Sequence, residues 1–161
     1  MIVHHAGENA PHDLRLDLTL DAPRAAVWRC WREALLLKQW YCPKPWRVES
    51  VYAVYEPGGR FNSVFAGPNG ERFENTGCLL AIDEGARLVF TDFYREGFVP
   101  AEKHFMTGYL ELSDDGAGKT RMIWGARHGT DEDTKKHLDM GFVDGWKAAA
   151  AQLEELAKTL G

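Results

Sequence analysis

The sequence lacks long hydrophobic runs, and no stretch approaches the ~18 consecutive apolar residues that a membrane-spanning helix needs. It also lacks a basic segment followed by an apolar one at its start, where residues 1–13 read MIVHHAGENAPHD, so nothing indicates a secretory signal. We therefore expect a soluble protein of the cytoplasm that does not bind membranes.

Basic tracts and paired cysteines are absent as well. The 19 Lys and Arg residues are interspersed among 24 Asp and Glu residues, so no surface is expected to follow a nucleic-acid backbone. Cys30, Cys42 and Cys78 form no CxxC pair, which is typical of reduced thiols packed in a core. Glycine-rich phosphate loops and a GxSxG nucleophile motif are also missing, and we expect no cofactor.

What the sequence does contain is the composition of an ordinary globular domain. Its 161 residues include 45% apolar and 27% charged side chains, which is enough to form one hydrophobic core. Repeats, low-complexity tracts and linker-like segments are missing. We therefore predict a single domain over residues 1–161, with its core between residues 14 and 160.

Alternation and turn signals predict the elements of most of the chain. Leucines at every second position over residues 14–20 predict a strand with one buried face. Short helices should follow at 25–31 and 34–40, the second ending before Pro43. Turns rich in glycine then separate β-rich runs. These runs predict antiparallel strands at 46–55, 60–66, 71–82, 87–94, 104–112 and 120–128.

The last segment contains no proline, and Thr130 or Asp131 can cap a helix that we expect to run without interruption over residues 131–160. A helical wheel centred on Trp146 gives this helix a largely apolar face. That face carries Asp139, Phe142, Ala149, Ala150, Leu153, Ala157 and Leu160, whereas other directions are taken by His137, Met140 and Lys147. The helix should lie across the concave side of a curved antiparallel sheet of about seven strands, an α+β architecture.

Several motifs occur in an order that resembles one known family. They are Asp21-Ala22-Pro23, Val27-Trp28, Gln39-Trp40-Tyr41, Glu56-Pro57-Gly58-Gly59, Leu88-Val89-Phe90-Thr91, Gly141-Phe142 and Gly145-Trp146. Together they resemble the branch of the SRPBCC superfamily named after the activator of the heat-shock-protein-90 ATPase, which shares the helix-grip fold of START-type and birch-pollen-allergen-like proteins. Residues 42–46, CPKPW, resemble an uncharacterised, polyketide-cyclase-like subset. The resemblance implies the fold but no single function, because carriers, enzymes and co-chaperones share it.

A helix laid across a curved sheet leaves space that only large side chains can fill, and space of this kind commonly binds ligands. The sequence supplies six tryptophans and eight phenylalanines. We predict that a small hydrophobic molecule binds there, and simple core packing is the alternative for each candidate. The apolar candidates are Trp40, Trp46, Phe90, Met106, Trp124, Phe142 and Trp146.

The expected strand register adds two histidines to this site. If the strands that hold Leu112 and Thr120 pair around the turn at 114–118, His104 lies opposite His128 and both point inward. Two neighbouring imidazoles in an apolar cleft would resist double protonation and could hold or transfer a proton. Ordinary solvated histidines at the open end of the hairpin are the alternative.

Polar positions complete the candidate set. Asp139 falls on the buried face of the wheel, where it should pair with a group such as Arg127 or lie at the pocket mouth. By alternation, one of Glu74 and Asn75 should face inward, and the sequence leaves open which. No HxxxH or HExxH spacing supports a metal site, and we expect none.

Three functions remain open at this point. We prefer a protein that sequesters or presents a hydrophobic metabolite. The alternatives are a cyclase- or hydrolase-like enzyme that uses His104 and His128, and a stress-related module that binds a chaperone ATPase. A homodimer formed through strand 60–66 is also open.

Overall fold

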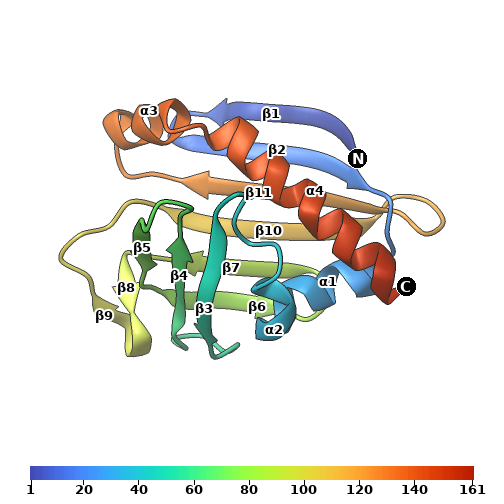
Figure 1. Cartoon of the computed structure of the whole chain (residues 1–161). Coiled ribbons are helices and arrows are strands. Elements are labelled where there is room, and N and C mark those ends of the chain that lie inside the picture. The colour runs from blue at the N-terminus through green and yellow to red at the C-terminus, as the bar shows by residue number, and fades with distance from the viewer.

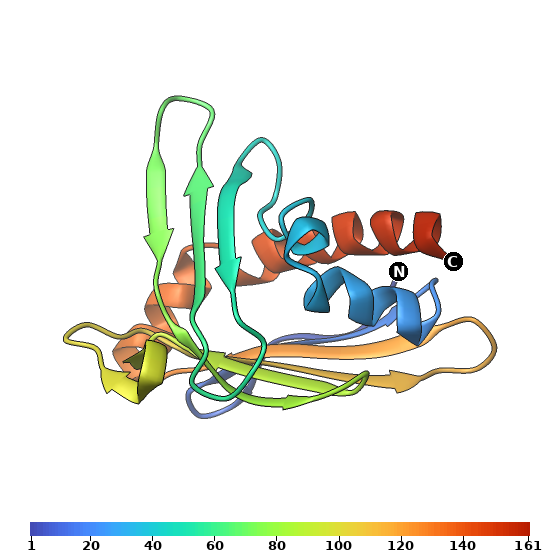
Figure 2. The same cartoon turned by 90° about the horizontal axis from the view of Figure 1, so that it is seen from below.

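The computed structural model describes all 161 residues, and its largest element is an antiparallel sheet of six strands in the order β1-β2-β11-β10-β7-β6 (Figure 1). These strands are β1 (Ile2–Ala10), β2 (Asp13–Leu20), β6 (Cys78–Asp83), β7 (Arg87–Thr91), β10 (Thr107–Asp114) and β11 (Thr120–Arg127). The helices and a smaller sheet cover one face of this sheet (Figure 2). The α+β class and the arrangement of a sheet under a C-terminal helix are confirmed.

A second, three-stranded sheet stands upright on the face of the main sheet that also carries the helices (Figure 2). Its strands are β3 (Arg47–Ala53), β4 (Phe61–Ala66) and β5 (Arg72–Asn75). A small hairpin of β8 (Tyr94–Arg95) and β9 (Val99–Pro100), joined by a 3₁₀ turn at Glu96–Phe98, lies at one end. The upright sheet therefore closes one side of the space above the main sheet.

Four helices complete the fold. They are α1 (Arg24–Arg32), α2 (Ala34–Leu37), α3 (Asp131–Asp139) and α4 (Phe142–Leu160). Helix α4 crosses the main sheet diagonally and contacts α1 and β2 (Figure 1). No helix is both long and apolar enough to cross a membrane.

The core forms where the apolar face of α4 meets the main sheet. All four leucines of β2 are completely buried there, as the alternation of that strand predicts. On the opposite face of β2, the Asp17 carboxylate accepts two hydrogen bonds from Arg121 of β11, which satisfies a buried charge. The core contains 26 buried apolar residues, so the centre of the space between α4 and the sheet is occupied by side chains.

Two features of the strand pattern differ from the sequence-based expectation. Strand β1 was not predicted, because most of its side chains are exposed on an edge strand and show no buried periodicity. The predicted strand 71–82 is two strands in different sheets. The chain changes sheet at Gly77, where a side chain would collide with the carbonyl group of Thr91, so only glycine allows this close approach.

The prediction of one uninterrupted helix over residues 131–160 is wrong. The chain leaves helical geometry at Gly141, whose φ of 93° lies in the left-handed region that favours glycine, and α4 begins at the next residue. This break changes the rotational phase of α3 relative to α4. A wheel centred on Trp146 therefore places the side chains of α3 on the wrong faces.

Candidate ligand site

Aromatic side chains from six parts of the chain form one continuous cluster on the helix-bearing face of the main sheet. Successive ring centroids lie 5.9, 6.4, 4.2, 5.6 and 5.0 Å apart. We use "aromatic cluster" for these six residues, which in this order are Phe65, Tyr41, Trp124, Trp146, His137 and Phe105. The cluster connects the upright sheet with α4 and α3.

The members of this cluster differ in exposure. Trp124 and His137 are buried, whereas Tyr41, Phe65 and Trp146 are half-buried, as is Phe105. Trp146 stacks on Trp124 with nearly parallel rings. A large aromatic ring that keeps accessible surface beside a buried aromatic layer can bind a flat apolar molecule.

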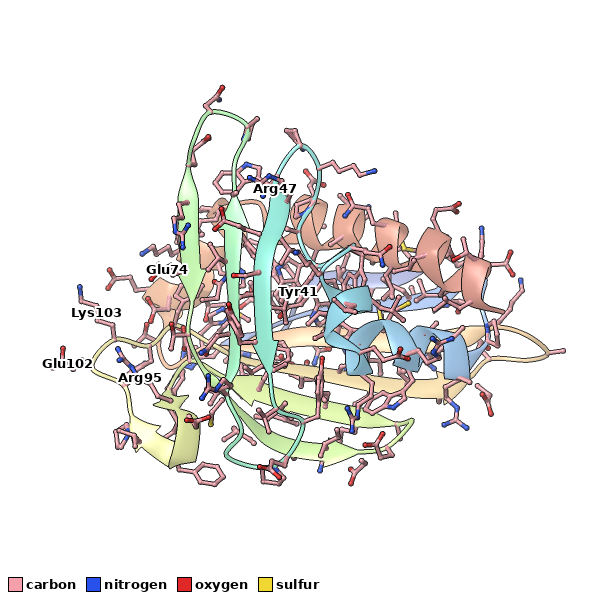
Figure 3. The ribbon with its side chains drawn as sticks, turned by 60° about the horizontal axis from the view of Figure 1, so that its bottom comes forward. Tyr41, Arg47, Glu74, Arg95, Glu102 and Lys103 are labelled. Carbon is pink, nitrogen blue, oxygen red and sulfur yellow. The ribbon has the colours of Figure 1, made fainter.

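Tyr41 is held in place by a polar tether from α4. The side-chain amide of Gln152 donates to the carbonyl groups of Trp40 and Cys42, at 3.0 and 2.9 Å, and its oxygen accepts from the Lys44 backbone at 2.9 Å. These three bonds fix the residues that follow α2. Figure 3 shows Tyr41 directed toward the interior beside β3.

Hydrogen-bond donors without partners lie in and behind the cluster. The indole nitrogens of Trp31 and Trp124 are fully enclosed and have no acceptor, and the two rings lie 5.3 Å apart. The Tyr41 hydroxyl also has no protein partner among the side-chain hydrogen bonds, and burial raises its pKa, so it remains a donor at neutral pH. A buried donor that lacks a partner costs about 1–3 kcal/mol. Of these three donors, only the Tyr41 hydroxyl is not fully enclosed and could receive an acceptor from a ligand.

His137 of the aromatic cluster forms a hydrogen-bonded pair with His128, which lies outside the cluster. Nε2 of His128, the residue after β11, lies 2.8 Å from Nδ1 of His137 on α3. Burial lowers the pKa of both rings, and that of His137 falls to about 4. Both imidazoles are therefore neutral at pH 7.

Comparisons with known proteins identify the family. The sequence profile of the family described as Activator of Hsp90 ATPase homolog 1-like protein matches residues 21–158. The chain belongs to this family. Its crystallised relative from Nitrosomonas europaea is 38% identical, with a TM-score of 0.89 over 94% of this chain and 97% of the relative. The resemblance inferred from the motifs is thus confirmed.

More distant structures share the fold alone. A Mycobacterium smegmatis protein is 23% identical, with a TM-score of 0.79 over 96% of both chains. A Rhodobacter sphaeroides protein is 16% identical, with a TM-score of 0.81 over 96% of this chain and 98% of the other. A comparison with curated proteins finds no match. The helix-grip architecture of the Activator of Hsp90 ATPase homolog 1-like family is therefore present, and it leaves the ligand to be argued from the site.

The apolar residues predicted for the site fall into two groups in this family member. Trp40, Phe90, Trp124 and Phe142 are buried in the core. Trp46, Met106 and Trp146 are half-buried. Only Trp124 and Trp146 belong to the aromatic cluster, so the accessible aromatic surface lies where α4, α3 and the upright sheet meet, at the edge of the filled core.

The predicted pairing of His104 with His128 is wrong. β10 and β11 pair Leu110 with Trp124 and Asp114 with Thr120, two residues out of the expected register. His104 precedes β10, is exposed, and stacks on Phe93 with ring centroids 4.1 Å apart. The turn occupies residues 115–119, one position later than the expected turn at 114–118, and this shift moves the pairing by two residues.

The predicted burial of Asp139 is also wrong. Its side chain is exposed and forms an ion pair of 2.7 Å with Lys135 one turn earlier. His137 takes the inward position instead, because the break at Gly141 rotates α3. Gly141 itself was the available signal, since glycine after a helical run commonly ends a helix.

The upright sheet resolves the choice between Glu74 and Asn75. Asn75 is half-buried and donates to the Ser63 hydroxyl at 3.2 Å. Glu74 is exposed and lies at the periphery in Figure 3. Asn75 is therefore the residue of this pair whose side chain packs against the rest of the protein.

Neither a group of metal-ligating side chains nor the two surface hollows on α3 offers an alternative apolar site. No three His, Cys, Asp or Glu side chains come together in a way that could hold a metal ion. Two surface hollows of about 430 and 300 Å³ lie on α3. Their walls are mainly charged or polar, and include Glu132, Lys135 and Lys136 in one and Glu8, Asp131 and Thr134 in the other.

Proposed function

We propose that this protein binds a small, flat, largely apolar molecule on the accessible side of the aromatic cluster. The observation that carries the proposal is the stack of half-buried Trp146 on buried Trp124, with half-buried Tyr41 packed against Trp124 and half-buried Phe65 packed against Tyr41. A ring placed against this surface would remove apolar area on both sides from water. At about 25 cal/mol per Å², roughly 200 Å² of buried apolar area favours binding by about 5 kcal/mol before entropic costs.

The Tyr41 hydroxyl supports the same site. It has no protein acceptor and burial keeps it protonated, whereas the unpaired indole N–H groups of Trp31 and Trp124 are enclosed in the core, beyond the reach of a ligand. Proteins rarely leave buried donors unpaired without a reason. A ligand with a carbonyl or ether oxygen would supply an acceptor while its rings pack on the cluster.

Two measurements test the proposal. Native mass spectrometry of protein purified from its own host should show a retained small molecule. For a defined probe, we expect 2-methoxynaphthalene to quench tryptophan fluorescence saturably, and Trp146→Ala to weaken its binding at least about tenfold because the stacking surface is removed.

The matched control is Tyr52→Ala. Tyr52 lies on β3 with its ring 63% exposed, away from the core, so its loss should leave the affinity for the probe unchanged. A wild-type protein that retains no molecule and shows no saturable response to 2-methoxynaphthalene would contradict the proposal. Equal losses in Trp146→Ala and Tyr52→Ala would place binding elsewhere.

A further inference from the structure

The hydrogen bonds around His128 and His137 determine where their protons lie. The carbonyl oxygen of His12 can only accept, and it lies 3.1 Å from Nδ1 of His128, so this nitrogen carries a proton. In the neutral ring, Nε2 of His128 is then bare and must accept the hydrogen bond of 2.8 Å from Nδ1 of His137. The assignment follows from the partners, because hydrogen positions are set by the network.

This chain of donors leaves one nitrogen without a role. If Nδ1 of the neutral His137 ring carries the proton, its Nε2 has a free lone pair, and none of the hydrogen bonds uses it. The fully enclosed side-chain nitrogens without a partner are those of Arg15, Trp31 and Trp124, so Nε2 of His137 keeps some accessible surface. An acceptor is therefore available at a ring that is otherwise buried.

The surroundings of this acceptor are apolar on the side away from His128. The centroids of Phe105, Phe142 and Trp146 lie 5.0, 5.1 and 5.6 Å from that of His137. Phe105 is fixed because its backbone N–H, like that of Met106, donates to the Asp92 carboxylate. A ligand bound on Trp146 would lie beside this ring.

We propose that the ligand carries a phenolic or enolic hydroxyl that donates a hydrogen bond to Nε2 of His137. This inference rests on the proposed function and specifies the ligand class for the same site. The relay from the His12 carbonyl through His128 fixes the tautomer of His137 so that Nε2 is the acceptor. An acidic hydroxyl suits this position, because a hydrogen bond to a neutral imidazole in apolar surroundings strengthens with the acidity of the donor.

The test compares 2-naphthol with 2-methoxynaphthalene by calorimetry at pH 7. Both probes present the same rings and an ether or hydroxyl oxygen, and only 2-naphthol can donate. In the wild type we expect 2-naphthol to bind roughly tenfold more tightly, the effect of one well-formed hydrogen bond. In His137→Phe this preference should disappear, while His104→Gln, which alters an exposed histidine, should retain it.

For each protein, the affinity for 2-naphthol is divided by the affinity for 2-methoxynaphthalene. Comparing this ratio between the wild type and the variants removes the contribution of the extra methyl group. Equal binding of both probes to the wild type overturns this inference and leaves the proposed function intact. Failure of both probes to bind overturns the two together.

A measurement on the wild type keeps the inference testable even if His137→Phe does not fold. In ¹⁵N-resolved NMR of the free protein, Nε2 of His137 should resonate as an unprotonated nitrogen and Nδ1 of His128 as a protonated one. Adding 2-naphthol should shift the His137 Nε2 signal in the direction of hydrogen-bond acceptance, and 2-methoxynaphthalene should not. A protonated Nε2 in the free protein, or an equal response to both probes, would refute the assignment.

Discussion

The two ends of the aromatic region use the same residue types in opposite ways. At the closed end, Trp31 and Trp40 are completely buried, and their rings meet edge to face at 4.7 Å. At the open end, Trp146 and Phe105 keep accessible surface around His137. The closed end fills the core and the open end presents a surface, so an aromatic side chain here is informative about binding only when its exposure is known.

Removing Trp31 should have the largest effect on this comparison. Its ring contacts Trp40, Tyr41 and Trp124, and none of it is exposed. We expect Trp31→Ala to lower the free energy of unfolding by about 3–5 kcal/mol, because a large cavity forms in the core. Urea denaturation measures the loss.

The control for this experiment is Leu35→Ala on the neighbouring helix α2. The side chain of Leu35 is 80% exposed, so the free energy of unfolding should change by less than about 0.5 kcal/mol. A loss below about 1 kcal/mol in Trp31→Ala would mean that the closed end is not a packed core.

The next largest effect should come from acidification, because the paired imidazole rings of His128 and His137 lie at the open end. The folded state holds the pKa of His137 at about 4, against about 6.5 when unfolded. The unfolded chain therefore binds more protons below pH 6.5, and the stability that neutral His137 provides is complete above that pH and is lost as the pH falls toward 4. At pH 5 the loss is about 2 kcal/mol.

Denaturation curves at pH 7 and pH 5 for the wild type and His137→Phe measure this contribution. The wild type should lose more stability than the variant, since other titrating groups contribute equally to both. His128, whose pKa is also lowered by burial, is present in both proteins and adds to the pH dependence of each. Identical pH dependence in the two proteins would show that His137 is not held neutral by the fold.

The smallest expected effect comes from the break that creates the open end. Gly141 has a positive φ and open space where a side chain would lie. The cost of Gly141→Ala is therefore that of the backbone conformation, about 1–2 kcal/mol in the free energy of unfolding. Thermal unfolding monitored by circular dichroism should record this loss.

Gly145→Ala is the matched control, because Gly145 lies inside α4, also has open space at its Cβ, and has no positive φ. Alanine is the better helix former there, so the variant should be as stable as the wild type or more so. A stabilised Gly141→Ala protein would indicate that α3 and α4 can join, which would turn His137 away from the site.

Much of the architecture was readable from local patterns. Strand β2 and helix α4 each bury one face, and the spacing of apolar residues in the sequence shows this directly. The turn residues between the strands mark where each strand ends. The partners of polar side chains were not readable in this way. A register change of two residues kept the same faces buried while it moved His104 out of the sheet.

The amino-acid sequence by itself determined the α+β class, the apolar face of α4 and the abundance of aromatic rings, because these depend on composition and on periods within one element. Only the tertiary structure decided that His137 rather than His104 meets His128, that Asp139 points to solvent, and that Trp146 remains accessible while Trp40 does not. Those outcomes depend on the register of two strands and on one left-handed glycine, and each converts a small local change into a different set of long-range neighbours.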